Sequence, residues 1–436
     1  MGRLFGTDGV RGIVNETLNA ELAFRLGRAA AEVLTEDTRH KPVIVIGKDT
    51  RVSGDMLEAA LTEGVTSAGA DVLLAGVVPT PAVAYFAKYH ADAGVVISAS
   101  HNPYEYNGIK FFNGCGYKLS DELEDRIESL INQPLKIGGG IGRIRPYVQA
   151  AERYIEYLLS SVTFDLSGLR VALDCANGAA SATAEALFRY MNPKELFVIN
   201  DRPDGVNIND RCGSTHMEAL RALVTEKHCD VGFAFDGDAD RCLCVDADGN
   251  IVDGDKIMAV CALHEKEPAF VATVMSDLGL HIWARERGIR LVCAPVGDRY
   301  VLEEMLKSGI MLGGEQSGHL IFLWHSTTGD GQLTALKLLS AMAETGESIQ
   351  SLTSEIPKYP QVLLNIPVRW EDKAKIAEHP AVSAAVAEAE KSLGADGRVL
   401  VRPSGTEALV RVMVEGRDAE EIAALAHEIQ RAVESA

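Results

Sequence analysis

Short apolar runs alternate with helical patterns along most of this chain, and this alternation limits the fold more than any other feature. Leucine, alanine and valine recur at helical spacing from Leu18 to Val33, and apolar runs follow at Pro42–Gly47, Val72–Gly76 and Gly94–Ile97 with helical patterns between them. Runs of this kind are typical of parallel strands joined by helices that cover both sheet faces. The sequence therefore predicts an α/β fold.

The same pattern restarts twice before the character of the chain changes. Strand and helix patterns alternate again over residues 169–235 and 270–307, whereas the part after about residue 360 has hairpin-like strands and an alanine-rich helix. We predict three similar α/β domains with mixed, mainly parallel sheets and a C-terminal α+β domain. The predicted boundaries are 1–150, 151–254, 255–364 and 365–436, with a surface hairpin or connector at residues 136–140.

Composition and charge exclude several classes of protein. The chain carries 42 basic and 62 acidic residues, a net charge of −20, and has no run rich in lysine or arginine, so we expect no nucleic-acid partner. It has no apolar window of the ~18 residues that a membrane span needs and no secretion signal, and its eight cysteines are scattered. We expect free thiols, no membrane partner and a cytoplasmic location.

One polar cluster follows the apolar run that ends at Ile97. It contains Ser98, Ser100 and His101, and a second apolar run carrying Lys110 begins after an Asn-Gly turn signal. A hydroxyl beside an imidazole, with a lysine nearby and at the end of a strand, indicates a group-transfer site. A polar turn whose hydroxyls bond only to their own backbone explains the pattern equally well.

A second cluster, Asp236-Gly-Asp-Ala-Asp-Arg241, directly follows an apolar strand pattern. Carboxylates at Asp236, Asp238 and Asp240 can converge on one hard cation, and Mg²⁺ is favoured if a phosphate supplies further ligands. A calcium-binding helix–loop–helix is excluded, because its loop would need glycine and glutamate where this chain has Arg241 and Ala247. An aspartyl-phosphate phosphatase is the alternative that is harder to exclude, although the third carboxylate favours a metal-binding site over a nucleophile and its acid/base partner.

Three further glycine-containing stretches carry donors and acceptors. Gly6–Gly12 contains Arg11, Gly314–His319 contains Glu315, Ser317 and His319, and residues 402–407 contain a guanidinium and two hydroxyls. The last stretch is typical of an anion cradle, to which Arg411 could add a second guanidinium. The Gly314–His319 stretch and residues 402–407 are each explained equally well as a structural turn.

Taken together, these five stretches resemble the α-D-phosphohexomutase family over essentially the whole chain. The motifs are GTDGVRG, ISASHNP with NGIKFF, DGDADR, GEQSGH and RPSGTE. The resemblance implies four domains around a central cleft and a phosphorylated Ser100 that completes a Mg²⁺ site with Asp236, Asp238 and Asp240. It also implies catalytic roles for Lys110, His101, His319 and Arg11, and substrate binding by Glu315, Ser317, Arg402, Ser404, Gly405, Thr406 and Arg411.

The form of the motifs is most similar to the bacterial branch of the family that acts on glucosamine phosphates. That resemblance implies interconversion of glucosamine 6-phosphate and glucosamine 1-phosphate, with glucosamine 1,6-bisphosphate as intermediate and activator, for UDP-N-acetylglucosamine and cell-wall synthesis. Tyr106 departs from the usual Asp before Asn-Gly. The alternatives are a relative acting on mannose or glucose phosphates and a sugar-phosphate binder without turnover. A homodimer and an unidentified activating phosphate donor are further expected partners.

Overall fold

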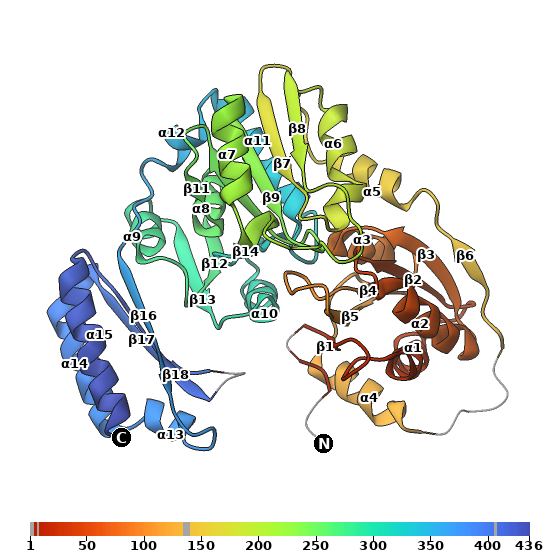
Figure 1. Ribbon diagram of the computed structural model, residues 1–436, viewed down its shortest axis with the longest axis horizontal. Helices are drawn as coiled ribbons and strands as arrows, with labels where there is room; N and C mark the ends of the chain where they lie inside the picture. The colour runs from red at the N-terminus through yellow and green to blue at the C-terminus, as the bar shows by residue number, and fades with distance from the viewer. Residues whose placement is uncertain (1–3, 7, 134–139, 405–407) are drawn as a thin grey trace. The chain divides into compact units, whose positions relative to one another are not determined.

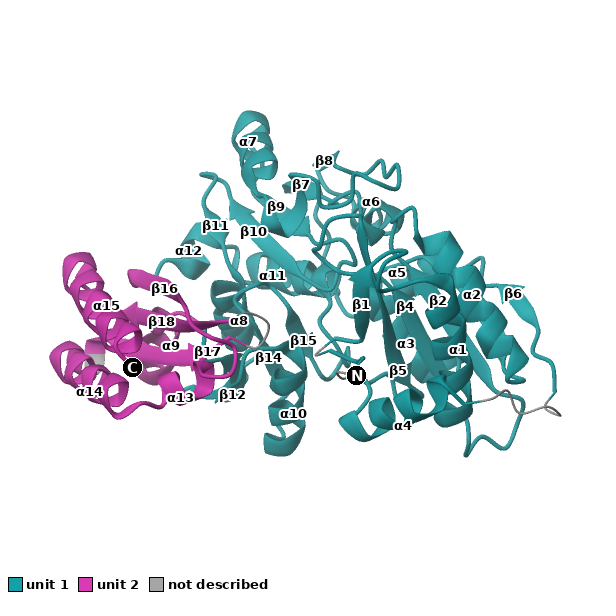
Figure 2. Cartoon of the chain, turned by 60° about the horizontal axis from the view of Figure 1, so that its bottom comes forward, with its two compact units in different colours: residues 1–275, 289–354 teal, residues 276–288, 355–436 magenta. Residues whose placement is uncertain are grey.

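The computed structural model describes residues 4–6, 8–133, 140–404 and 408–436. The chain forms two compact units (Figure 2): unit 1 is Met1–Met275 with Ile289–Ser354, and unit 2 is Ser276–Gly288 with Glu355–Ala436. Of the connector expected at residues 136–140, residues 136–139 lie outside the described residues. No helix in the described ranges is long and apolar enough to cross a membrane.

The first part of unit 1 contains a six-stranded mixed sheet. Its strand order is β1-β5-β4-β2-β3-β6, and β5 runs antiparallel to both of its neighbours while the other pairs are parallel. The strands are β1 (Val10–Ile13), β2 (Val43–Lys48), β3 (Asp71–Val77), β4 (Ala93–Ile97), β5 (Tyr106–Asn113) and β6 (Ile144–Pro146).

Helices cover both faces of this sheet (Figure 1). On one face, α1 (Ala20–Leu34), α2 (Gly54–Ser67) and α4 (Asp121–Ile131) bury a continuous apolar cluster against β2, β4 and β5. On the other face α3 (Thr80–His90) lies so close that a Cβ at Gly47 would meet the Val83 side chain at 2.5 Å. The N-termini of α1 and α4 begin at Asn19 and Ser120, whose side chains accept hydrogen bonds from backbone amides.

A second sheet in unit 1 has the order β11-β10-β9-β7-β8. Strand β7 (Arg170–Asp174) is parallel to β8 (Glu195–Ile199) and β9 (Val231–Phe235), whereas β10 (Cys242–Asp246) is antiparallel to β9 and to β11 (Ile251–Val252). The helices of this part are α5 (Ala150–Leu159), α6 (Ala184–Tyr190) and α7 (Glu218–Lys227), with short 3₁₀ turns at Ala179–Ala182 and Gly213–Thr215.

The third sheet of unit 1 has the order β13-β12-β14-β15. Strand β12 (Ala269–Thr273) is parallel to β13 (Arg290–Ala294) and β14 (Leu312–Gly314), and β14 is antiparallel to β15 (Leu320–Phe322). Its helices are α8 (Gly254–His264), α10 (Asp298–Ser308), α11 (Gly331–Thr345) and α12 (Ile349–Thr353).

Each of these three sheets changes from parallel to antiparallel pairing at one hairpin. The hairpins are β4–β5, β9–β10 and β14–β15. Their connecting loops contain, in turn, the serine cluster, the aspartate cluster and the Gly314–His319 motif. The three motifs therefore occupy the same position in three similar architectures.

Unit 2 is built on a three-stranded antiparallel sheet of order β16-β18-β17. The strands are β16 (Gln361–Pro367), β17 (Arg398–Pro403) and β18 (Leu409–Glu415), and the helices are α9 (Leu278–Glu286), α13 (Lys373–Ala377), α14 (Pro380–Leu393) and α15 (Ala419–Glu434), with a 3₁₀ turn at Gly394–Asp396. Buried aliphatic residues of β16, β18, α14 and α15 form its core. The segment that carries α9 joins unit 2 because Arg398 donates to the Ser276 carbonyl at 2.6 Å and the Tyr359 amide donates to Asp277 at 3.2 Å.

The predicted fold class is confirmed: three α/β parts with mixed, mainly parallel sheets precede an antiparallel α+β part. No helical pattern was predicted for the segments that form α4, α5, α8, α11, α12 and α13.

Candidate active site

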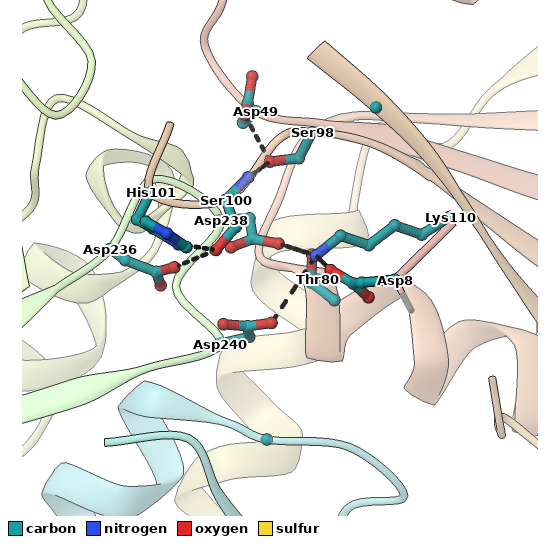
Figure 3. A network of polar contacts seen from close by, with 12 residues as sticks. Asp8, Asp49, Thr80, Ser98, Ser100, His101, Lys110, Asp236, Asp238 and Asp240 are labelled. Carbon is teal, nitrogen blue, oxygen red and sulfur yellow. Dashed lines mark hydrogen bonds and ion pairs between the residues drawn. The ribbon is translucent and has the colours of Figure 1, made fainter. Parts of the chain in front are cut away.

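Ser100 lies on the loop after β4 with its hydroxyl directed at the aspartate cluster (Figure 3). Its Oγ donates to Asp236 Oδ2 at 2.6 Å, and its side chain is buried. The neighbouring candidate Ser98 does not hydrogen-bond to the aspartate cluster. Its Oγ donates to Asp49 at 2.6 Å and accepts from the Ser100 amide at 2.9 Å. The geometry therefore favours Ser100 over Ser98 as the reacting hydroxyl, a choice that the spacing alone could not make.

The aspartate cluster occupies the loop of the β9–β10 hairpin. Ligand atoms of Asp236, Asp238 and Asp240 all lie within 4.8 Å of one another, and the three residues are buried. Oδ1 of Asp238 and Oδ1 of Asp240 are buried without a hydrogen-bond partner among the described residues. Burial and the two neighbouring carboxylates raise the pKa of Asp236 well above its usual range. Unsatisfied carboxylate oxygens that repel one another fit a hard cation such as Mg²⁺.

Lys110 extends from β5 to this cluster on the sheet face opposite the main core. Its Nζ lies 2.8 Å from Asp238 Oδ2, 2.9 Å from Asp8 Oδ2 and 3.8 Å from Asp240 Oδ2. Burial alone would lower the pKa of Lys110, but Asp238 and Asp8 reverse this and hold it far above the ordinary value. Lys110 therefore remains an ammonium group at neutral pH, which suits charge stabilisation better than proton transfer.

Asp8 connects three cationic side chains beside Ser100. Its carboxylate accepts a hydrogen bond from Lys118 Nζ at 2.5 Å, contacts Lys110 and forms a short ion pair with Arg11. Arg11 extends from β1, and its Nε is buried without a hydrogen-bond partner among the described residues. An orphaned guanidinium donor held by a carboxylate is suited to an incoming phosphate oxygen.

His101 lies next to Ser100, with its Nδ1 3.3 Å from Ser100 Oγ. Burial, followed by the charges of Arg241 and Arg11, lowers the pKa of His101 to about 4. The imidazole is consequently neutral at physiological pH and can exchange hydrogen bonds without adding positive charge.

The Gly314–His319 motif forms the tight loop of the β14–β15 hairpin. His319 Nδ1 lies 3.5 Å from Asp240 Oδ2, and its Nε2 lies 3.6 Å from Asp298 Oδ2. Burial lowers the pKa of His319, but Asp240 and Asp298 raise it above the ordinary value. The Gly329 amide donates to Nε2 at 3.0 Å and opposes protonation there, so the proton of the neutral ring belongs on Nδ1, facing Asp240.

Two more side chains of this hairpin can meet a ligand. Ser317 Oγ is buried with no hydrogen-bond partner among the described residues. Glu315 accepts from the Gly297 amide at 3.0 Å, and burial raises its pKa. A hydroxyl and a carboxylate on one short loop are suited to binding sugar hydroxyls.

Gly329 is needed where it touches the His319 ring. A Cβ at this position would meet three ring atoms at 2.5–2.6 Å, and the ring itself is buried. We expect Gly329→Ala to displace the imidazole and lower kcat roughly 10- to 100-fold, measured by steady-state turnover. Gly168→Ala is the control, since a Cβ there meets nothing within 4 Å. Equal turnover by the two variants would contradict a role for the observed position of His319.

In unit 2, the expected anion-binding residues lie on neighbouring strands. Arg402 of β17 and Arg411 of β18 are directly opposed in the antiparallel register. Burial, and then the charge of Arg411, lowers the pKa of Arg402. Ser404 follows β17, whereas Gly405 and Thr406 lie outside the described residues. Opposed guanidinium groups repel each other, so an anion bound to both would relieve that repulsion.

Lys373 adds a third cation at this end of unit 2. Its Nζ donates to the Ser404 carbonyl at 2.6 Å and lies 3.3 Å from the centroid of the Trp370 ring. The sequence analysis did not identify it, because an exposed-looking lysine some thirty residues from the motif gives no signal.

The structure thus brings the candidates of unit 1 into one network: Ser100, His101, Lys110, Arg11, Asp236, Asp238, Asp240 and His319, with Glu315 and Ser317 on the same hairpin as His319. Arg402, Ser404 and Arg411 belong to unit 2. Sequence reasoning missed the residues that orient this network: Asp49, Arg51, Thr80, Lys118 and Asp298. Of these residues, only Asp49 and Arg51 could have been identified from the sequence as site candidates, since both lie within three residues of the end of strand β2.

Comparison with known proteins gives a consistent result over the whole chain. The four models that describe phosphoglucomutase/phosphomannomutase match residues 2–137 (α/β/α domain I), 152–249 (domain II), 253–359 (domain III) and 363–432 (C-terminal domain). Phosphoglucosamine mutase of Clostridium acetobutylicum is 54% identical, and that of Thermoanaerobacter sp. strain X514 is 53% identical, over 100% of this chain and 99% of each relative.

Solved structures share the fold. A phosphoglucomutase/phosphomannomutase family protein from Burkholderia thailandensis is 25% identical, with a TM-score of 0.84 over 99% of this chain and 97% of that chain. Aspergillus fumigatus N-acetylphosphoglucosamine mutase, solved with GlcNAc-6P and magnesium, is 17% identical with a TM-score of 0.69 over 99% and 95%. Full-length identity above one half and four consecutive domain matches mean that this chain belongs to the phosphoglucomutase/phosphomannomutase family.

Proposed function

We propose that this chain is a phosphoglucosamine mutase, an isomerase that interconverts glucosamine 6-phosphate and glucosamine 1-phosphate. The observation that carries the proposal is the Ser100 hydroxyl 2.6 Å from a buried cluster of three aspartates, in a chain that matches curated phosphoglucosamine mutases from end to end. The reaction would supply glucosamine 1-phosphate for UDP-N-acetylglucosamine and cell-wall synthesis.

The donor set of the cluster supports Mg²⁺ as the resident cation. Asp236, Asp238 and Asp240, with the phosphate on Ser100, would hold it, and two of their oxygens have no hydrogen-bond partner among the described residues. When bound, Mg²⁺ draws negative charge from the phosphoryl group during transfer.

In the first half-reaction, phospho-Ser100 donates its phosphoryl group to the C1 hydroxyl of glucosamine 6-phosphate. The new bond joins that hydroxyl oxygen to phosphorus, the bond from phosphorus to Ser100 Oγ breaks, the sugar hydroxyl proton passes to a base, and the released Oγ takes up a proton. Lys110 and Arg11 stabilise the charge that spreads over the phosphoryl oxygens. His319 is the candidate acid/base, and neutral His101 hydrogen-bonds to Ser100 Oγ.

The second half-reaction reverses these roles with the intermediate turned around. Glucosamine 1,6-bisphosphate returns its 6-phosphate to Ser100 and leaves as glucosamine 1-phosphate, and the same bisphosphate would load an unphosphorylated enzyme. Glu315 and Ser317 would bind hydroxyls common to both orientations. Arg402, Ser404, Gly405, Thr406 and Arg411 would bind the phosphate that is not reacting.

Several wider expectations stay predictions. We propose a division at 1–150, 151–254, 255–364 and 365–436, a cytoplasmic location, a homodimer and a separate donor for the first phosphate on Ser100.

A substrate panel tests the function. With Mg²⁺ and a hexose 1,6-bisphosphate present, we expect kcat/KM for glucosamine 6-phosphate to exceed that for glucose or mannose 6-phosphate by about 10-fold or more. Preference for either neutral sugar would replace the proposal with a phosphoglucomutase or phosphomannomutase activity. Phosphate released to water would instead identify a phosphatase.

A further inference from the structure

The polar segment between β8 and α7 has no assigned role in the reaction, yet it reaches the reactive serine. This segment, residues 200–216, is rich in Asn, Asp and Gly, and three of its non-glycine residues have positive φ: Asn200 (51°), Asn209 (58°) and Arg211 (51°). A positive φ raises the conformational energy of a non-glycine residue, so it persists only where surrounding contacts stabilise it. The segment is therefore held in one conformation by its contacts.

Anchors at both ends fix the segment to the rest of unit 1. The Gly213 amide donates to Asp174 Oδ2 at 3.0 Å, and the Gly205 carbonyl accepts from the Val52 amide at 2.8 Å. The Asn209 amide itself donates to the Ala176 carbonyl at 3.0 Å. Asn209 is consequently fixed by its own backbone, and the residue is 8% exposed.

The side chain of Asn209 ends on the serine loop. Its Nδ2 donates to the Ser100 carbonyl at 2.9 Å and to the Asn102 carbonyl at 3.1 Å. Since both neighbours are carbonyl acceptors, only the NH₂ end of the amide can satisfy them. The contact therefore depends on an amide and not on shape alone.

Arg51 binds the same two carbonyls through a second donor group. Its Nη2 donates to the Ser100 carbonyl at 2.9 Å and to the Asn102 carbonyl at 2.8 Å, and its Nε is paired with Asp49 at 2.9 Å. Asp49 in turn accepts from Ser98, whose hydroxyl accepts from the Ser100 amide. The peptide groups on both sides of Ser100 are thus held by side chains.

These contacts affect the conformation of Ser100, because its φ of 54° lies in the left-handed region. A left-handed serine is strained, and release of its carbonyl would let φ relax and turn Oγ away from Asp236. The approach is also close: a Cβ at Gly237 would meet the Ser100 carbonyl oxygen at 2.5 Å and Asn209 Nδ2 at 2.8 Å. Ser100, Gly237 and Asn209 therefore form one tightly packed contact.

We propose that Asn209 is a positioning residue for phosphoryl transfer, which together with Arg51 clamps the Ser100 carbonyl and so directs Oγ toward Asp236. The inference rests on the proposed mutase function. It gives Asn209 a role in transfer, and the two hydrogen bonds that carry this role involve neither Glu315 nor Ser317.

The test compares changes at two asparagines of the same segment. Asn209→Asp keeps the side-chain shape but replaces the donor with an anionic acceptor facing two carbonyls. Asn207→Ala is the control, since the Asn207 side chain bonds to Asp204 and Arg202 of the same segment and not to the serine loop. Each protein is first loaded to the same level with phosphate on Ser100, checked by intact mass, and is then mixed with glucosamine 6-phosphate in a single turnover.

We expect Asn209→Asp to slow single-turnover transfer roughly 10- to 100-fold while the Kd for glucosamine 6-phosphate is unchanged, because a misdirected group reacts slowly without losing substrate contacts. Asn207→Ala should transfer at the wild-type rate. An unchanged transfer rate in Asn209→Asp overturns the proposal, as does a loss of rate that follows the fall in Tm equally in both variants. A wild-type protein that accepts phosphate on Ser100 but transfers it to no sugar phosphate contradicts the mutase function itself, and the positioning role with it.

Discussion

Replacement of Ser100 by alanine should remove mutase turnover, with kcat falling on the order of 10⁴-fold or more, because a covalent carrier has no substitute in the site. The hydroxyl is the only part of the side chain that changes, and it contacts Asp236 at 2.6 Å and His101 at 3.3 Å. Intact-mass spectrometry after incubation with a hexose 1,6-bisphosphate should show one added phosphate on the wild-type protein and none on Ser100→Ala.

Ser98→Ala is the control for Ser100→Ala, since it tests whether the phosphate is carried by Ser98 instead. Ser98 is buried and bonds to Asp49 and to the Ser100 amide, so its loss should lower Tm and slow turnover while the phosphate still maps to Ser100 in peptide mass spectrometry. Phosphate retained by Ser100→Ala, or lost from Ser98→Ala, would assign the carrier to the other serine.

Replacement of Asp238 by asparagine should lower kcat by roughly 10²- to 10³-fold and raise the Mg²⁺ concentration needed for half-maximal activity. Asp238 has two tasks in the structure. One oxygen accepts hydrogen bonds from Lys110 and from Thr80, at 2.8 and 2.7 Å, and the other is unsatisfied and available to a cation. Asp238→Asn keeps the side-chain shape but removes the negative charge that attracts both the Lys110 ammonium group and a cation.

The matched control is Asp248→Asn, which removes an exposed carboxylate on the chain that follows the same hairpin. It should titrate with Mg²⁺ as the wild-type protein does, since no contact joins it to the cluster. Near-normal kcat of Asp238→Asn at the wild-type Mg²⁺ requirement would rule out the three-aspartate cation site. Circular dichroism of both variants checks that the fold is retained.

The sequence predicted the fold class because strand and helix periods are local signals. Apolar runs such as Gly94–Ile97 and Val231–Phe235 are buried on both faces and appear directly in the residue order. Helices α8 and α11 were missed because nearly all their residues are buried, so they show no polar face to reveal the helical period. The pairing of α9 with unit 2 is a long-range contact that no local pattern contains.

Motifs of the candidate site were visible, but the partners that orient them were not. Ser100 and the three aspartates lie in compact polar clusters after apolar strands, which a reader of the sequence can find. Asn209 acts through one amide in a long polar segment, and Gly329 acts by leaving room for the His319 ring and by donating its backbone amide to it. Roles of this kind depend on distances between residues far apart in the chain, so residue types and spacing do not encode them.

The division of unit 2 between residues 276–288 and 355–436 has a consequence for synthesis on the ribosome. Helix α9 leaves the ribosome before the sheet that completes its unit, and Arg398 of β17, which contacts the Ser276 carbonyl and His281 of this segment, lies more than a hundred residues further along. Domains usually fold as units during translation, from the N-terminal end onward. Unit 2 can therefore fold only when the chain is nearly finished, and in nascent chains that stop before β17 the α9 segment lacks its Arg398 contacts.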